Sequence, residues 1–378
     1  MPLKVLFFTR VPAILQHRLD MYIGPVSQVY QTEFWDLSPV YGRAESLSAA
    51  DSGCIKIGSA GELAARLESE RERCRLVIIT NILIKDLGLF YPLTRRLGIP
   101  IVNISKETFY HWLFRREAVH QAWKARAAYG LQKWYRNLPP ARRMRQFRSF
   151  GPVRYDYQLA SCNFYPEESR HFVRIHHLKY DGFLEAREQA PVLDGSYILF
   201  IDSAMADHPM YQGAGNKIDR QAYLDQLDRY FRLLEESAGM PVVIAAHPKS
   251  DYSPEDFRGR KIYLYNTPVL IRYARAVVAH YSTSLIDVLL QDKPFQILYS
   301  RDLMSSCTQQ MTFAGLQLAR RVGAECINLE APVFHDFTFS KKKYARFIRR
   351  YLVKPDETER SNAALILDFL KTLEGKGT

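Results

Sequence analysis

Short apolar runs alternate with amphipathic helical patterns along this chain, and the alternation occurs in two series. The first series includes RLVIITN at residues 75–81, and the second includes SYILFID at 196–202 and PVVIAAHP at 241–248. Apolar runs without a polar alternation are typical of strands buried on both faces of a parallel sheet. Parallel neighbours need a crossover between them, usually a helix. The pattern therefore predicts α/β domains built on parallel sheets.

A polar stretch at residues 164–195 separates the two series. It contains two prolines and ends at Gly195. We place the domain boundary after residue 190, which gives an N-terminal domain over 1–190 and a C-terminal domain over 191–378. The helical patterns at 340–352 and 356–374 either complete the second domain or cross back to the first. The chain of 378 residues is long enough for two cores of ordinary size. We therefore expect two facing Rossmann-like domains, with ligands beyond the carboxyl ends of the strands.

The start of the chain and its cysteines indicate a cellular compartment. No apolar run approaches the roughly 18 residues of a membrane-spanning helix. The opening MPLKVLFFTRVP lacks the long apolar core of a signal peptide. The five cysteines are scattered and have no spacing typical of zinc sites or disulfide frameworks. We therefore predict a cytoplasmic protein with reduced cysteines and no bound metal.

Positive charge is concentrated in one segment. The formal net charge of the chain is +12, and residues 114–148 hold ten Lys or Arg against one Glu. Three of the four tryptophans lie within 112–148. Aromatic side chains interleaved with cations are typical of helices on an anionic membrane, so we expect 112–148 to attach the protein peripherally to the inner face of the cytoplasmic membrane. A solvated helical hairpin and a nucleic-acid-binding surface are the alternatives, and we expect no nucleic acid as a partner.

Polar side chains follow three strands of the second series, at the points where the strands end. Because the carboxyl ends of parallel strands share one edge of a sheet, we expect these side chains in one crevice. The helix predicted after the third strand offers backbone N–H groups to a phosphate. Each residue alone is more often a turn former or a helix cap. The candidates are Asp202, Asp207 and His208 after the first strand, His247, Pro248, Lys249 and Ser250 after the second, and His280, Ser282, Thr283 and Ser284 after the third.

Two runs resemble the HP and Ser/Thr motifs of bacterial CMP-sugar-dependent glycosyltransferases, namely PVVIAAHPKSDY and TPVLIRYARAVVAHYSTSLIDVLLQDKPFQIL. These families include sialyl- and polysialyltransferases and the β-Kdo transferases of capsule and lipopolysaccharide synthesis. HHLKYDGFL and YILFIDSAMADHP are also similar to polysaccharide-biosynthesis proteins near the β-Kdo group, although an acidic residue is expected where Lys179 stands. The resemblance covers residues 154–300. It implies the GT-B fold, in which two Rossmann-like domains face each other across a cleft.

The resemblance also implies roles for the candidates. Asp202 first, and Asp207 second, is the catalytic carboxylate, a nucleophile in a retaining enzyme or a general base in an inverting one. The donor is a CMP-activated 2-keto sugar acid, with Kdo before other sugars, and neither a cofactor nor a metal is required. The residues expected to bind the donor's phosphate and sugar carboxylate are His247, Pro248, Lys249, His280, Ser282, Thr283 and Ser284.

The first domain is expected to bind the acceptor, a lipid-linked lipopolysaccharide, O-antigen or capsule glycan. Arg10, Asn81 and Glu107 follow its strands and are the candidate contacts. Several alternatives remain open. The donor could be a sialic acid-type CMP-sugar, a UDP-sugar with Asp287 holding its ribose, or CDP-glycerol. The chain could also be a non-catalytic protein that binds a membrane or nucleic acid.

Overall fold

The computed structural model describes residues 1–11, 15–42, 53–105, 153–164, 166–208, 211, 216 and 218–375. Contacts divide them into two units. Unit 1 holds residues 1–105, 153–178 and 354–375, and unit 2 holds the described part of Lys179–Val353. The predicted membrane segment 112–148 and the candidate Glu107 lie outside the described residues.

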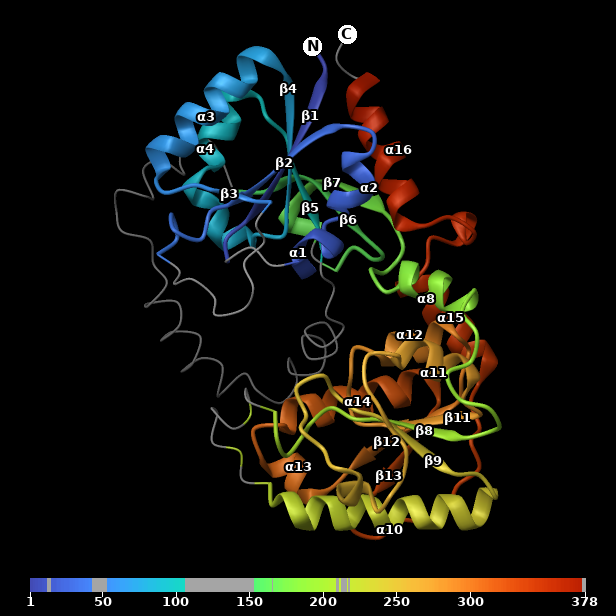
Figure 1. Ribbon diagram of the computed structural model, residues 1–378. Coiled ribbons are helices and arrows are strands. Elements are labelled where there is room, and N and C mark those ends of the chain that lie inside the picture. Colours follow the sequence, from blue (N-terminus) through green and yellow to red (C-terminus); the bar gives the residue numbers. More distant parts are fainter. Residues whose placement is uncertain are drawn as a thin grey trace. The chain divides into compact units, whose positions relative to one another are not determined.

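Unit 1 is built on a seven-stranded sheet with the order β3-β2-β1-β4-β5-β6-β7 (Figure 1). All neighbouring strands of this sheet run parallel. The strands are β1 (Leu3–Thr9), β2 (Gln31–Asp36), β3 (Ile55–Lys56), β4 (Arg75–Thr80), β5 (Ile101–Ile104), β6 (Tyr155–Ala160) and β7 (Ser169–Arg174). The described helices of this unit are α1 (Leu15–Asp20), α2 (Ile23–Ser27), α3 (Ala60–Arg73), α4 (Tyr91–Leu97) and α16 (Asn362–Gly375), with 3₁₀ turns at η1 (Ile84–Leu89), η2 (Pro166–Glu168) and η4 (Pro355–Glu357).

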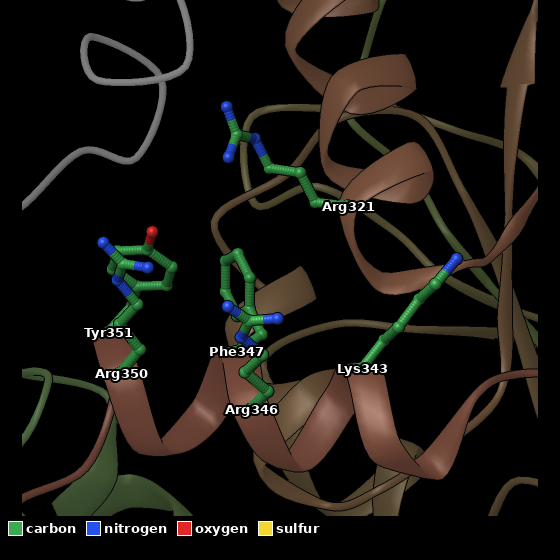
Figure 2. A pocket seen from close by; sticks show the side chains of 6 residues that line it. All are labelled: Arg321, Lys343, Arg346, Phe347, Arg350 and Tyr351. Carbon is green, nitrogen blue, oxygen red and sulfur yellow. The ribbon is translucent and has the colours of Figure 1, made fainter.

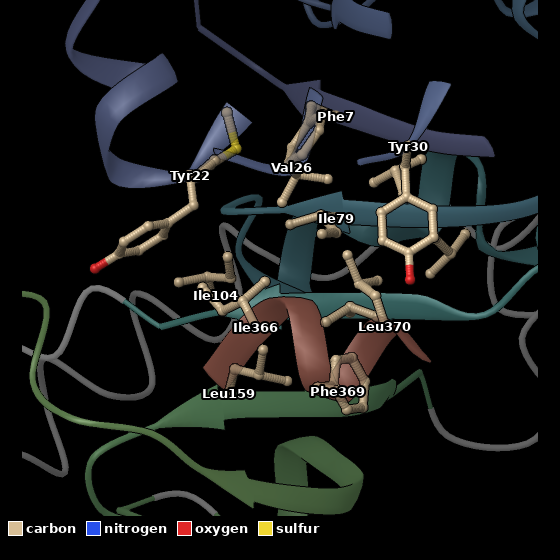
Figure 3. Packing of buried hydrophobic residues seen from close by; sticks show 14 of the residues in the cluster. Phe7, Tyr22, Val26, Tyr30, Ile79, Ile104, Leu159, Ile366, Phe369 and Leu370 are labelled. Atoms are coloured by element: carbon tan, nitrogen blue, oxygen red, sulfur yellow. The ribbon is translucent and has the colours of Figure 1, made fainter. Parts of the chain in front are cut away.

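Alternating side chains of β1 serve two hydrophobic cores, one on each face of the sheet. Val5 and Phe7 belong to the core that includes residues of α2 and α16 (Figure 3). Leu6 and Phe8 belong to the core that includes residues of α3 and α4. Successive side chains of a strand point to opposite faces, so a strand that is apolar throughout must be covered on both sides. The apolar residues of LKVLFFT are buried on both faces for this reason, and Lys4 is buried with them because it pairs with Glu33 and Glu70.

The C-terminal helix α16 packs in unit 1. Ile366 and Leu370 are fully buried in the same core as Phe7 (Figure 3), and burying a side chain of this size contributes about 1.5–3 kcal/mol. At the first residue of α16, Asn362 Oδ1 accepts a hydrogen bond from the backbone N–H of His176 at 2.8 Å. The end of the chain is therefore held to the first unit by both packing and hydrogen bonding.

This division differs from the predicted domains in two ways. The boundary falls between Leu178 and Lys179 rather than after residue 190, and residues 354–375 return to the first unit. The predicted bounds place α16 in the second domain with crossing back as the alternative, and its buried side chains belong to the core of unit 1.

Unit 2 is built on a six-stranded sheet with the order β10-β9-β8-β11-β12-β13 (Figure 1), again with all neighbours parallel. The strands are β8 (Ile198–Ile201), β9 (Val242–Ala245), β10 (Ile262–Tyr263), β11 (Ala276–Ala279), β12 (Phe295–Tyr299) and β13 (Glu325–Asn328). The described helices are α8 (Tyr180–Arg187), α10 (Arg220–Ala238), α11 (Thr267–Tyr273), α12 (Leu285–Leu290), α13 (Arg301–Ser305), α14 (Gln309–Val322) and α15 (Lys341–Tyr351), with a 3₁₀ turn at η3 (Pro254–Phe257).

Helix α10 follows directly from its sequence. Asp219 caps its start, because the side chain accepts from the backbone N–H of Ala222 at 2.7 Å. Gly239 ends it with φ 64°, a left-handed conformation that glycine adopts without a steric cost. Tyr223 and Phe231, on the buried face between these ends, enter the core of unit 2.

Both sheets have the Rossmann strand order, in which the first strand lies between the second and the fourth. Ligands of such sheets bind beyond the carboxyl ends of the strands, at the point where the order reverses. That point lies between β1 and β4 in unit 1 and between β8 and β11 in unit 2. Among the described residues, no helix combines the length and the apolar character needed to cross a bilayer.

Candidate functional site

The carboxyl ends of β9, β8 and β11 lie side by side in unit 2, because these strands are neighbours in the sheet. Asp202 begins the loop after β8, His247 lies in the loop after β9, and His280 begins the loop after β11. The first and third loops are also hydrogen-bonded, since Ser203 Oγ donates to the carbonyl of Tyr281 at 3.3 Å. The three predicted donor loops therefore meet at one edge of the sheet.

Asp202 is buried and joins two of these loops through four hydrogen bonds. Its Oδ1 accepts from the backbone N–H of Ala204 at 2.9 Å and from the hydroxyl of Tyr252 at 3.3 Å. Its Oδ2 accepts from the backbone N–H of His247 at 3.2 Å and from the hydroxyl of Ser250 at 2.9 Å. Burial raises the pKa of Asp202, and the hydrogen bonds act in the opposite direction. With 3% of Asp202 exposed, this geometry holds the His247 loop in place.

His247 presents one ring nitrogen to its own loop. Nδ1 accepts from the backbone N–H of Lys249 at 3.1 Å. A nitrogen that accepts carries no proton, so the neutral ring holds its proton on Nε2. Burial lowers the pKa of His247 and the charge of Lys249 lowers it further, which keeps the ring neutral at pH 7. The Nε2–H group is a hydrogen-bond donor suited to a phosphate oxygen, and both Lys249 and Pro248 are exposed beside it.

His208, a candidate to which the sequence assigned no specific role, packs against His247. The two rings meet edge to face with 5.0 Å between their centroids. Burial lowers the pKa of His208, the neighbouring His247 and Lys249 act in the same direction, and Asp202 opposes them. A repeated His-Pro pair was the signal that could have assigned it a role beside His247, since His208 precedes a proline after β8 as His247 does after β9.

Asp207 lies in the same loop as Asp202 but is paired with a cation. Its Oδ2 is 3.0 Å from Nε of Arg220, whose Nη1 is 2.8 Å from Oδ1 of Asp256. Hydrogen bonds to Asp256 and Asp207 raise the pKa of Arg220. The side chain of Asp207 is 26% exposed, so of the two predicted carboxylates Asp207 is the one that a substrate can reach.

The prediction that His280 binds the donor is contradicted by the structure. His280 is 1% exposed, its Nδ1–H donates to the carbonyl of Leu298 at 3.0 Å, and its Nε2 accepts from the hydroxyl of Tyr223 at 2.8 Å. Burial lowers the pKa of His280 to about 4. Both ring nitrogens are therefore occupied within the core. The reason is strand alternation, since His280 lies two residues after Val278 and faces the same core.

The Ser/Thr turn after β11 lies at the surface of the same edge. Ser282 Oγ accepts from the backbone N–H of Ser284 at 3.3 Å, which uses that hydroxyl within the turn. Thr283 is exposed and Ser284 is half-buried. In the described part of the chain, neither of their hydroxyls has a hydrogen-bond partner in the protein. These two hydroxyls can donate to a ligand.

Asp287 does not match the UDP-sugar alternative in which it holds a ribose. It is 1% exposed, and its Oδ2 is 3.3 Å from Nζ of Lys179, at the start of α8. Burial raises the pKa of Asp287 to about 6, and Lys179 opposes this shift. The lysine that departs from the expected acidic residue therefore pairs with a buried carboxylate inside unit 2.

The candidates of unit 1 lie at the corresponding edge of its own sheet. Arg10 follows β1 and Asn81 follows β4, and these strands are neighbours. Arg10 forms an ion pair with Asp86, and 21% of its side chain is exposed. Asn81 is half-buried. Glu107, the third predicted acceptor contact, lies outside the described residues.

The edge of unit 2 therefore brings together groups that can donate hydrogen bonds. It combines a neutral imidazole with an Nε2 proton, an exposed ammonium, and the hydroxyls of Thr283 and Ser284. Within the residues described here, no group of three or more His, Cys, Asp or Glu side chains is placed to hold a metal ion. What the edge can do chemically is donate hydrogen bonds and positive charge to phosphate or carboxylate oxygens.

No protein-family model matches the sequence, and no curated protein matches it. Solved structures do resemble it. The calicheamicin glycosyltransferase CalG4 is 10% identical, with all of both chains covered and a TM-score of 0.51. The UDP-GlcNAc 2-epimerase of Methanocaldococcus jannaschii is 12% identical over 92% of this chain and 99% of that one, with a TM-score of 0.46. MurG of Acinetobacter baumannii is 11% identical over 87% of each chain, with a TM-score of 0.43.

The chain has the GT-B fold. The likeness to CalG4, together with two parallel α/β units in Rossmann order, carries this conclusion. The predicted fold class is confirmed. At this level of identity the likeness extends to the fold alone, so the donor and the acceptor stay predictions.

Proposed function

We propose that this chain is a glycosyltransferase whose unit 2 binds a nucleotide-activated sugar at the carboxyl edge of β8, β9 and β11. The observation that supports it best is the geometry of His247. Four hydrogen bonds to Asp202 order the loops around it, and a hydrogen bond from Lys249 leaves the imidazole proton on Nε2. A fixed donor beside an exposed ammonium is the arrangement that stabilises a leaving phosphate.

The donor is a CMP-activated 2-keto sugar acid, with Kdo as the first sugar to test. Such a donor carries two anionic groups, the phosphate and the sugar carboxylate. His247 and Lys249 suit the phosphate, and the hydroxyls of Thr283 and Ser284 suit the carboxylate. The motif resemblance supports this donor class, and burial of Asp287 weighs against a ribose-binding role for that residue.

Asp202 and Asp207 have different roles in this proposal. Asp202 is a positioning residue, because the hydrogen bonds that it accepts from His247 and Ser250 shape the phosphate site. Asp207 is the catalytic carboxylate, because its side chain is the more exposed of the two and is held in place by its ion pair with Arg220. An ionised carboxylate can attack the anomeric carbon or accept the proton of the acceptor hydroxyl.

The acceptor is a lipopolysaccharide, O-antigen or capsule glycan, bound by unit 1 through Arg10, Asn81 and Glu107. A lipid-linked acceptor places the reaction at the inner face of the cytoplasmic membrane. Segment 112–148 is proposed to hold the enzyme there, since it combines tryptophans with ten cations. Nucleic acid has no part in this proposal.

Calorimetric titration with CMP, UDP, CDP and GDP tests the donor site. We expect CMP to bind most tightly, and His247→Ala to weaken CMP binding at least about tenfold, the effect of losing one charge-assisted hydrogen bond. His335→Ala is the matched control, an exposed histidine of unit 2 outside the three loops. Tighter binding of UDP or CDP would move the donor to a UDP-sugar or CDP-glycerol. Absence of binding by every nucleotide would favour a non-catalytic protein.

A further inference from the structure

Helix α15 of unit 2 carries a cationic face that the candidate site does not use. Its sequence KKKYARFIRRY holds no acidic residue. Tyr344, Phe347 and Tyr351 are buried, so the apolar side of the helix packs on the core of the unit. The opposite side is exposed and consists of Ala345 and six cations, Lys341, Lys342, Lys343, Arg346, Arg349 and Arg350.

Three of these cations stand where an α-helix disfavours them. Lys341, Lys342 and Lys343 form the first turn, which contains no acid. The N-terminus of a helix carries partial positive charge, so cations there are unfavourable. Ser340 already caps the helix by accepting from the backbone N–H of Lys343. Helix stability therefore gives no reason for the lysines at 341 and 342.

Three cations of this face, Lys341, Lys342 and Arg346, have no counter-charge among the described residues. Lys343 differs, because its side chain reaches Gly323 at the C-terminal end of α14, where positive charge is favourable. An exposed cluster of like charges without acids attracts an anionic partner.

A hollow of about 300 Å³ lies among these side chains (Figure 2). Figure 2 shows that one of its cations comes from the end of α14 and the others from α15. The hollow has room for one phosphate group beside Arg346, which pairs with no carboxylate among the described residues, and cationic pockets bind lipid headgroups in this way. The residues that line it are Arg321, Lys343, Arg346, Phe347, Arg350 and Tyr351.

The cationic face lies at the opposite edge of the sheet from the candidate donor site. Tyr344 Oη donates to the carbonyl of Lys293 at 3.1 Å, directly before β12. Lys343 reaches Gly323, directly before β13. Both contacts are at the amino ends of strands, whereas His247 lies at a carboxyl end. Binding at α15 is therefore separate from binding of the sugar donor.

We propose that the cationic face of α15 binds the anionic lipid headgroups of a membrane surface. The contact is electrostatic, because the apolar side of α15 faces the core and has nothing to insert into the acyl chains. Proteins that bind single-stranded nucleic acid stack bases on exposed aromatic side chains. Phe347 and Tyr351 are 4% and 7% exposed, so the face offers no such platform. It fits a surface of phosphates rather than bases.

The test measures partition of the full-length protein onto vesicles of phosphatidylcholine with and without phosphatidylglycerol. The variant Lys341→Gln/Lys342→Gln/Arg346→Gln removes three charges and keeps a high helix propensity. The matched control Arg229→Gln/Lys261→Gln/Arg301→Gln removes three exposed cations of unit 2 outside α15. Melting temperatures and binding to a single-stranded oligonucleotide are measured for all three proteins alongside.

Each cation near an anionic membrane strengthens binding about fivefold. We therefore expect the α15 variant to lose on the order of 100-fold in partition onto phosphatidylglycerol vesicles, while the control loses far less. The melting temperature of the α15 variant should be unchanged or slightly higher, because two lysines leave the positive end of the helix.

Four results would overturn the proposal. Unchanged vesicle partition would show that the face does not touch the membrane. An equal loss in the control would assign the effect to net charge. Loss of oligonucleotide binding without loss of vesicle binding would assign the face to nucleic acid. A melting temperature several degrees lower would assign the cations a structural role.

Discussion

The two units share a strand order, yet the edges that they present for ligands differ in chemistry. At the β1/β4 edge of unit 1, Arg10 pairs with Asp86, and Tyr155 Oη donates to the carbonyl of Ile82 at 2.6 Å. At the β8/β11 edge of unit 2, His247 keeps an Nε2 proton for a ligand and Thr283 exposes a hydroxyl. The two groups named at the edge of unit 1 are paired within the protein, whereas the two named at the edge of unit 2 are available as donors. The scaffold thus fixes where loops meet, and the loop residues fix what they can bind.

The largest loss of stability and of nucleotide binding is expected from removing the carboxyl group of Asp202, which orders the edge of unit 2. Asp202→Ala leaves the buried backbone N–H groups of Ala204 and His247 without acceptors. Each unsatisfied donor costs about 1–3 kcal/mol, so the free energy of unfolding should fall by roughly 4 kcal/mol, and nucleotide binding should be lost. Urea unfolding and calorimetry measure both.

Asp207→Ala is the control for that substitution. It breaks a partly exposed ion pair with Arg220, which contributes about 0–1 kcal/mol, so stability should change little while sugar transfer is abolished. If Asp207→Ala retained normal turnover, the assignment of Asp207 as the catalytic carboxylate would be wrong.

Lowering the pH should reduce the free energy of unfolding through buried neutral histidines, which both units contain. The folded pKa of His280 is about 4, below the unfolded value of about 6.5, so the unfolded state takes up the proton first as pH falls. Stability is therefore full above pH 6.5 and is lost between pH 6.5 and 4, by about 3 kcal/mol. His280→Gln should flatten this pH dependence in urea unfolding.

His176 extends the same test to unit 1. Burial lowers its pKa to about 4 as well, so His176→Gln should also reduce the slope of stability between pH 6.5 and 4. A slope that neither substitution changes would contradict both assignments of a buried neutral ring.

A smaller loss of stability is expected from a substitution in α14, which packs closely against the residue before the Ser/Thr turn. A Cβ at Gly315 of α14 would lie 3.1 Å from Ile297 Cγ2 and 3.4 Å from Tyr281 N. Gly315→Val should therefore reduce the free energy of unfolding by about 1–3 kcal/mol, the cost of overpacking. Gly182→Val in α8 is the control, because nothing lies within 4 Å of a Cβ there. Equal losses of unfolding free energy in the two variants would show that α14 can shift to accommodate the larger side chain without a packing cost.

Substitutions at the edge of unit 1 are expected to change the affinity for the nucleotide least. Arg10→Ala and Asn81→Ala should leave the nucleotide dissociation constant within about twofold, because calorimetric affinity depends on donors in unit 2. The KM for the acceptor should rise instead. A tenfold loss of nucleotide affinity in either variant would contradict the assignment of nucleotide binding to unit 2 and of acceptor binding to unit 1.

The elements themselves were largely predictable from sequence. Ser59, with Glu62 three residues later, is a pattern that predicts a helix cap, and the Ser59 side chain accepts from the backbone N–H of Glu62. Gly98 and Gly239 follow helical patterns and so predict helix ends, and both have left-handed φ values at helix C-termini. Thr267 before Pro268 predicts an N-cap one residue too late, because Thr267 is the first residue of α11 and Asn266 is its N-cap. These signals are local, so a few consecutive residues suffice to encode them.

The candidate site was predictable as a set of loops but not residue by residue. Strand order brings the loops of Asp202, His247 and Ser282 to one edge, as the alternation of elements implied. Which way each side chain points was not implied. His247 and His280 both follow apolar strands, yet His280 is enclosed by Tyr223 and Leu298, while His247 keeps an available nitrogen.

By itself, the sequence determined two parallel α/β series and the order of their strands and helices, because apolar periodicity and caps act over neighbouring residues. Only the tertiary structure decided that α16 returns to the first unit and that Lys179 pairs with Asp287. It also decided that the carboxylate oxygens of Asp202 accept hydrogen bonds from the surrounding loops. The physical reason is that burial and hydrogen-bond partners depend on residues far apart in the chain, which meet only when the sheets are assembled.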